Sequence, residues 1–125
     1  MNNRNILINK KCIPCEGIGK SFTKKEADEY LKKVPNWNLS ENGKMIFREY
    51  SLKNFMSVIE SINKIAKIAE REGHHPDLHV TNYRELRIEL TTHALHGLTE
   101  NDFILAAKID VCLFDGVNKC HLQFF

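Results

Sequence analysis

The sequence predicts an α+β domain in which about three helices cover one face of an antiparallel sheet. Apolar residues recur at every third or fourth position between residues 52 and 72, which is the period of a helix. Apolar and polar residues alternate at 86–90, which is the period of a strand with one buried face. The dipeptide Asn42-Gly43 separates two further strand-like segments and has the composition of a hairpin turn. Together these patterns indicate a mixed fold rather than an all-helical one.

The first helix is expected over Thr23–Lys33. Thr23 and Glu26 have the spacing of a capping box, and Pro35 prevents the helix from continuing. Strands are then expected at residues 37–39 and 44–50, and the turn between them makes a hairpin the simplest interpretation.

The long helix is expected between about Leu52 and Glu72, and Gly73 is a natural end for it. The predicted core-facing stripe comprises Phe55, Val58, Ile59, Ile62, Ile65, Ala66 and Ala69. Pro76 biases His75 towards an extended backbone, so the helix cannot simply continue through the two adjacent histidines. We therefore expect His74 and His75 to leave the end of this helix and to face a cleft above the sheet.

The strand at 86–90 is followed by His93, which has the parity of the strand's polar residues and should emerge on the polar side. A last helix is expected to begin at Thr99, with Asp102 in its first turn. The predicted stripe of this helix comprises Phe103, Ala106, Ala107, Asp110 and Phe114. A carboxylate in a first turn accepts a free backbone N–H and complements the helix dipole. We expect Asp102 to face the same open side as His93.

The bulk properties fit one globular domain. The chain has 125 residues and a formal charge of +2, and its basic residues are interleaved with acidic ones, so direct binding of nucleic acid is not expected. No apolar run approaches the ~20 residues needed to cross a bilayer, and the first nine residues lack a signal-peptide core. We expect a cytoplasmic protein with an amino-terminal extension at 1–21, a main domain at 22–115 and a tail at 116–125.

A cluster of ionisable residues follows the long helix. It comprises Glu70, His74, His75, Pro76 and Asp77, followed by Tyr83, His93 and Asp102. Imidazoles at helix and strand ends can donate and accept protons near neutral pH. The order of an acidic residue, three spacers, His-His-Pro, an aromatic, a further His and an Asp resembles the signature of the pterin-4a-carbinolamine dehydratases. The similarity runs from about Phe22 to Asp110.

This resemblance implies a sheet of four strands, assembly into a homodimer or homotetramer, and 4a-hydroxytetrahydrobiopterin dehydratase activity. Such an enzyme is a hydro-lyase that eliminates water from the 4a-carbinolamine of a reduced pterin. The product is the quinonoid dihydropterin, and the reaction belongs to tetrahydrobiopterin recycling. Only protons and water move, so neither a cofactor nor a metal is expected.

The resemblance makes His74, His75 and His93 the catalytic candidates. We interpret His75 and His93 as the principal acid/base pair, while His74 also binds and polarises the pterin. Asp102 would orient a histidine or stabilise its protonated form. Tyr83, which we expect in a strand, would pack against the flat heterocycle. The sequence does not decide which imidazole acts on which proton.

Three alternatives stay open at this point. His79 and His96 raise the number of nearby histidines to five, enough for a zinc or iron site, although the His-Glu-x-x-His spacing is absent. The Cys12-Ile-Pro-Cys15 pair suits a metal or redox site but supplies only half of a structural zinc set. The resemblance also extends to family members that act as dimerisation cofactors of a homeodomain transcription factor, so a binding module competes with the enzyme.

Overall fold

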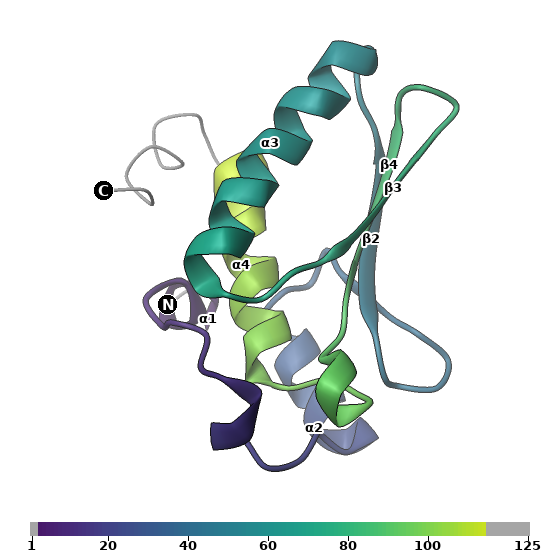
Figure 1. The fold of residues 1–125 in the computed structure, drawn as a ribbon. Coiled ribbons are helices and arrows are strands. Elements are labelled where there is room, and N and C mark those ends of the chain that lie inside the picture. Colours follow the sequence, from purple (N-terminus) through teal and green to yellow (C-terminus); the bar gives the residue numbers. More distant parts are fainter. Residues whose placement is uncertain (1–2, 115–125) are drawn as a thin grey trace.

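A computed structural model describes residues 3–114, and the predicted tail at 116–125 lies outside them. Within these residues, four strands form one antiparallel sheet in the order β1-β2-β4-β3 (Figure 1). The strands are β1 (Asn38–Leu39), β2 (Ile46–Ser51), β3 (Asp77–Thr81) and β4 (Glu85–Leu90). The predicted α+β fold class is confirmed, and so is the hairpin that pairs β1 with β2.

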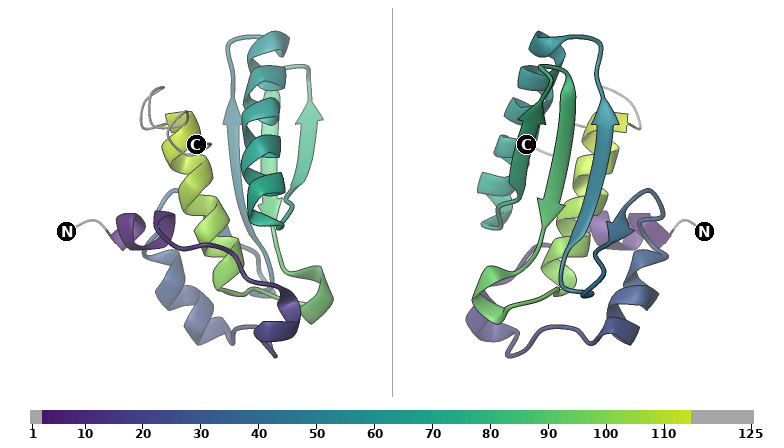
Figure 2. Two further views of the ribbon diagram at one scale, coloured as in Figure 1. Left: turned by 60° about the vertical axis from the view of Figure 1, so that its left-hand side comes forward. Right: turned by 90° about the vertical axis from the view of Figure 1, so that its right-hand side faces the viewer.

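The helices of the described chain are α1 (Asn3–Ile8), α2 (Lys24–Leu31), α3 (Phe55–Glu72) and α4 (Glu100–Phe114). Two short 3-10 turns, η1 (Cys15–Gly17) and η2 (His93–Leu95), precede α2 and α4. Figure 2 shows α3 and α4 side by side on the same face of the sheet. None of the described helices is long and apolar enough to span a membrane.

Local signals in the sequence match the observed ends of the helices. The Thr23 side chain accepts a hydrogen bond from the Glu26 amide, and the Glu26 carboxylate accepts one from the Thr23 amide, which completes the predicted capping box. Helix α3 begins after Asn54, whose side chain accepts a hydrogen bond from the Ser57 amide. It ends at Gly73, where φ is +67°, a value that only glycine adopts at little cost.

Helix α4 differs from the prediction of a single buried stripe. Every residue from Asn101 to Cys112 is buried, because α1, α2 and α3 all contact this helix. Asp110 is therefore inside the protein, where it accepts hydrogen bonds from the Trp37 indole at 2.9 Å and from Arg48 at 2.7 Å. Its charge is paired, as a buried carboxylate requires.

The amino-terminal extension packs against the same core. Leu7 and Cys12 are buried with the apolar side chains of the main domain, and α1 contacts α4.

Strand β3 was not predicted from the residue pattern of its own segment. It pairs along its length with β4. The side of the sheet away from the helices carries an ion-pair network in which Arg87 lies 2.6 Å from Glu89 and 3.2 Å from Glu49.

Candidate active site

The connection between α3 and β3 separates the two adjacent histidines. The Gly73 and His74 amides both donate to the carbonyl of Ala69, which closes the last turn of α3. Pro76 has no N–H and cannot extend the helix. As the chain leaves the helix, the His74 side chain turns into the protein and the His75 side chain turns to solvent. The two residues thus have different environments although they are neighbours in the sequence.

His74 forms a buried pair with Asp102. Its Nε2 lies 2.6 Å from Asp102 Oδ1, and the two side chains are 9% and 0% exposed. The other carboxylate oxygen accepts hydrogen bonds from the Thr92 hydroxyl and from the Thr99 amide, both at 2.9 Å. A buried charge is costly unless it is paired and hydrogen-bonded. Three donors surround Asp102, which satisfies that requirement.

The loop between β4 and α4 positions these donors. The Thr92 amide donates to the carbonyl of Gly97 at 2.8 Å, so the loop closes on itself, and His96 at its tip has a left-handed φ of 56°. This closure brings the Thr92 hydroxyl within 2.8 Å of the Thr99 hydroxyl. The start of α4 is thereby joined to the end of β4 directly beside Asp102.

The other two histidines of the motif also have carboxylate partners, but at the surface. His75 Nε2 lies 2.8 Å from Glu70 Oε1, with side chains 60% and 79% exposed. His93 Nε2 lies 3.5 Å from Asp77 Oδ2, and the His93 side chain is 72% exposed. Each of the three imidazoles therefore has its own carboxylate, and two of the imidazoles are open to a substrate.

This arrangement suits proton transfer. A carboxylate can only accept hydrogen bonds, so His74 donates from Nε2 to Asp102, and in the neutral ring its Nδ1 is then an acceptor. The exposed rings of His75 and His93 can exchange protons with a bound molecule, because their partners hold but do not cover them.

The predictions for Asp102 and Tyr83 are wrong. Asp102 does not face the open side with His93, because Thr92, Thr99 and His74 enclose it. Tyr83 is not in a strand: it lies in the turn between β3 and β4, with a φ of 50° and an exposed side chain.

Within one chain, the turn that holds Tyr83 is at the opposite end of β3 from the His74–His75 connection (Figure 1). The structure therefore does not bring this aromatic ring together with the histidines. Contact between Tyr83 and a substrate stays a prediction.

A second buried pair, which was not predicted from the sequence, lies beside the site. Glu72 Oε2 lies 2.6 Å from Lys108 Nζ, and both side chains are buried. Burial alone would raise the pKa of Glu72, but hydrogen bonds from Lys108 and the Cys12 amide outweigh it, so the pKa is lowered. The helical period could have indicated that Glu72 is buried, because Glu72 follows Ile65 and Ala69 on the buried face of α3.

The metal and redox alternatives gain no support. Within residues 3–114, no group of three or more His, Cys, Asp or Glu side chains is arranged to hold a metal ion. Cys12 and Cys15 are free thiols. Burial, and then the nearby charge of Glu72, raises the pKa of Cys12 to about 12, so this thiol stays protonated and a poor nucleophile or ligand at neutral pH.

Comparison with known proteins identifies the family. The family model described as pterin 4 alpha carbinolamine dehydratase matches residues 20–112. This chain belongs to the pterin-4a-carbinolamine dehydratase family. The match includes Glu70, the three motif histidines, Tyr83 and Asp102, so the predicted family is confirmed.

Several relatives support this membership in the dehydratase family. A putative pterin-4-alpha-carbinolamine dehydratase of Rickettsia bellii is 48% identical over 106 residues, which cover 84% of this chain and 92% of the relative. A similarly named protein of Halorhodospira halophila is 41% identical, covering 83% of this chain and 94% of its own length. The mitochondrial pterin-4-alpha-carbinolamine dehydratase 2 of Arabidopsis thaliana is 43% identical, and the match spans 57% of that longer protein.

Two solved structures have a similar fold. A transcriptional coactivator/pterin dehydratase from Brucella melitensis superimposes with a TM-score of 0.67 at 27% identity, covering 74% of this chain and 97% of the other. A pterin dehydratase-like protein that is a RuBisCO assembly factor has a TM-score of 0.53 at 19% identity, which is a likeness of fold alone.

Proposed function

We propose that this chain is a 4a-hydroxytetrahydropterin dehydratase, a hydro-lyase that removes water from the 4a-carbinolamine of a reduced pterin. The observation that carries the proposal is the set of three motif histidines, each beside its own carboxylate, inside the family match at 20–112. We further propose that the substrate is 4a-hydroxytetrahydrobiopterin and that the reaction serves tetrahydrobiopterin recycling.

The reaction requires two proton movements. One proton must reach the departing 4a-hydroxyl so that it leaves as water, and the proton on N5 must be removed so that the quinonoid dihydropterin forms. No electrons are gained or lost. Imidazoles have an ordinary pKa of about 6.5, so neutral and protonated rings coexist near pH 7 and can carry out both steps.

We propose that His75 and His93 are the acid/base pair, because their rings are exposed while carboxylates hold them in place. His74 would bind and polarise the pterin from the wall of the site, with its Nε2 held by Asp102. Asp102 is then a positioning residue, because it acts through His74 rather than on the substrate. We propose Tyr83 as a further substrate contact.

The assembly and location of the enzyme are also proposals. We propose a homodimer or homotetramer in the cytoplasm, as the family resemblance implies. The Arabidopsis relative is named as mitochondrial, so location varies among similar proteins. Sedimentation at micromolar protein concentration would measure the assembly directly.

A stopped-flow assay on freshly generated 4a-hydroxytetrahydropterin tests the activity. We expect dehydration to be accelerated above its spontaneous rate in proportion to the protein concentration. His79→Ala is the matched control, because His79 is also an exposed histidine, 3.0 Å from the carboxylate of Glu89, but lies outside the motif. The alternative outcome is no acceleration, together with a stoichiometric complex with a homeodomain transcription factor. That result would favour a binding module over an enzyme.

A further inference from the structure

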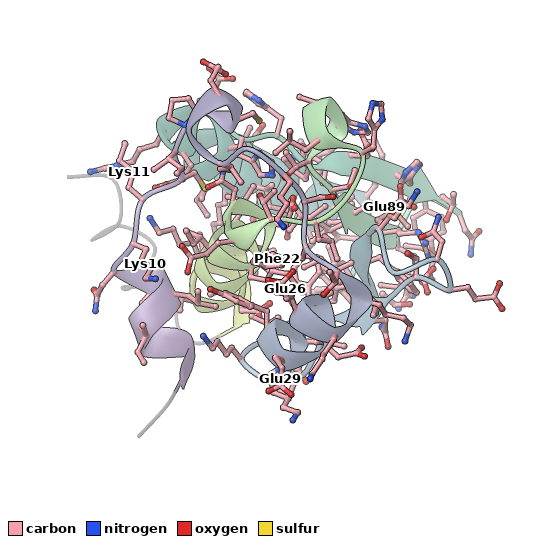
Figure 3. All side chains as sticks on the ribbon, turned by 90° about the horizontal axis from the view of Figure 1, so that it is seen from below. Lys10, Lys11, Phe22, Glu26, Glu29 and Glu89 are labelled. Atoms are coloured by element: carbon pink, nitrogen blue, oxygen red, sulfur yellow. The ribbon has the colours of Figure 1, made fainter. Side chains whose placement is uncertain are left out.

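The main chain at Cys12 and Ile13 lies between the end of α3 and the start of α4, the two elements joined by the His74–Asp102 pair. Figure 3 shows the amino-terminal segment passing Lys10 and Lys11 and returning to Phe22 at this end of the molecule. Its path is held at the surface by the Lys10–Glu100 ion pair at 2.7 Å, and at its far end by the Phe22 amide, which donates to the carbonyl of Leu98.

Glu72 holds this segment on the α3 side. Its Oε1 accepts a hydrogen bond from the Cys12 amide at 2.9 Å, while its Oε2 binds Lys108 of α4 at 2.6 Å. Both interactions are buried, so they are strong, and losing either partner would be costly. Glu72 therefore connects α3, α4 and the amino-terminal segment at one point.

Asn101 holds the segment on the α4 side. Its side-chain oxygen accepts from the Ile13 amide at 3.0 Å, and its side-chain nitrogen donates to the Ile13 carbonyl at 2.7 Å. The Cys12 thiol also donates to the Asn101 carbonyl at 3.5 Å. The two-way contact between the Asn101 amide group and one residue fixes both the position and the orientation of the segment.

These contacts form a closed ring with the candidate active site. Glu72 is two residues before His74, and Asn101 immediately precedes Asp102. Starting from Cys12, the ring runs through Glu72 to His74, across the hydrogen bond to Asp102, and back through Asn101 to Ile13. A shift of either side of the His74–Asp102 pair would therefore strain the attachments to Cys12 and Ile13.

We propose that Glu72 and Asn101 are positioning residues of the dehydratase. They hold the His74–Asp102 pair in place through hydrogen bonds to the main chain of Cys12 and Ile13. This inference rests on the proposed function. Catalytic groups must be held within about 0.5 Å of their productive geometry, and displacements of about 1 Å can cost 10²-fold in rate. The amino-terminal segment is then part of the active-site support.

The test compares Asn101→Ala with Lys10→Ala. The first variant removes both side-chain contacts to Ile13, whereas the second removes only the exposed attachment of the same segment. We expect Asn101→Ala to lower kcat by about 10-fold to 100-fold, the range for partners that orient a catalytic ligand, with a smaller change in KM. Lys10→Ala should keep kcat within about two-fold, as an exposed ion pair contributes little.

Repeating Asn101→Ala in a His74→Ala background separates positioning from general loss of structure. If Asn101 acts through His74, its effect on kcat should largely disappear in that background. Equal losses in both backgrounds, or an Asn101→Ala enzyme with wild-type kcat, would overturn the proposal. Ile13→Pro removes the same hydrogen bond from the main-chain side and replaces Asn101→Ala if that variant does not fold.

NMR spectra of the His74 side chain keep the inference separate from the proposed function, because they require no turnover. The His74 resonances should shift in Asn101→Ala, as Asp102 is held less firmly against the imidazole, and should not shift in Lys10→Ala. An inactive wild-type protein with these shifts would overturn the proposed activity alone. If the wild-type protein is active but Asn101→Ala leaves the His74 signals unshifted, the proposed ring of contacts is wrong.

Discussion

The buried His74–Asp102 pair and the exposed His75–Glu70 and His93–Asp77 pairs use the same chemistry in opposite environments. The buried carboxylate has three protein donors and no exposed surface, whereas the exposed pairs are in contact with water. Coulomb attraction is stronger in the low-dielectric interior than at the surface, where a pair typically contributes ~0–1 kcal/mol. This contrast supports our proposal that His74 and Asp102 form a rigid support and that His75 and His93 are the accessible proton carriers.

The largest expected effect is on the exposed side. His75→Ala and His93→Ala should each reduce the dehydration rate by ~10²–10⁴-fold, the range for positioned acid/base groups. Neither substitution opens a core cavity, because both side chains are mostly exposed, so the fold should be retained. Single-turnover rates measured beside circular dichroism spectra test both expectations.

The outcome distinguishes the two environments. Wild-type rates in both variants would remove the exposed histidines from the site, and a collapsed spectrum would show that they are structural. His79→Ala again serves as the control, since it removes an exposed ring paired with a carboxylate from the open face of the sheet.

The second effect is on stability and belongs to the buried pair. Asp102→Asn should lower the free energy of unfolding by about 3 kcal/mol, because it removes a buried carboxylate that accepts three hydrogen bonds. Glu70→Gln, which changes the exposed pair, should lower it by less than about 0.5 kcal/mol. Urea denaturation of both variants provides the measurement, and equal losses would contradict the contrast.

Much of the fold could be predicted because its signals are local. The capping box of Thr23 and Glu26 and the helix end at Gly73 depend on residues within one turn of each other. The alternation at 86–90 was also sufficient to identify β4. Periods and caps of this kind are visible without knowledge of the rest of the chain.

The ring around the active site could not be predicted, because its contacts are distant in sequence and made by the main chain. Cys12 and Glu72 are 60 residues apart, and Ile13 and Asn101 are 88 apart. A backbone amide is the same in almost every residue, so the sequence carries no mark of its partner. The placement of Tyr83 in a strand was wrong for another reason. Aromatic residues are typical of strands, yet here Tyr83 follows Asn82 in a left-handed turn.

The third effect concerns pH and the neighbouring buried pair of Glu72 and Lys108. Because the pKa of Glu72 is lower in the folded protein than in the unfolded chain, the carboxylate adds stability above its ordinary pKa of about 4.5. That contribution should be lost as the pH falls further. The stability difference between wild type and Glu72→Gln should therefore shrink between pH 6 and pH 3 in denaturation experiments. A constant difference would contradict the pairing.

The smallest expected effects are null results that test the metal and redox alternatives. Exhaustive chelation should leave turnover unchanged, and Cys12→Ser combined with Cys15→Ser should retain it, because main-chain contacts hold the segment. Loss of activity that one stoichiometric metal restores would favour the His-rich metal site. Loss in the double cysteine variant alone would point to the thiols.

NMR spectra of the histidine rings in Asp102→Asn test the contrast between the buried and exposed pairs most directly. The His74 ring resonances should change, because the buried carboxylate that holds its Nε2 is replaced by a neutral amide. The rings of His75 and His93 should keep their resonances, since Glu70 and Asp77 remain beside them. Unchanged resonances of all three rings would leave Asp102 as a helix cap and contradict its proposed role in the active site.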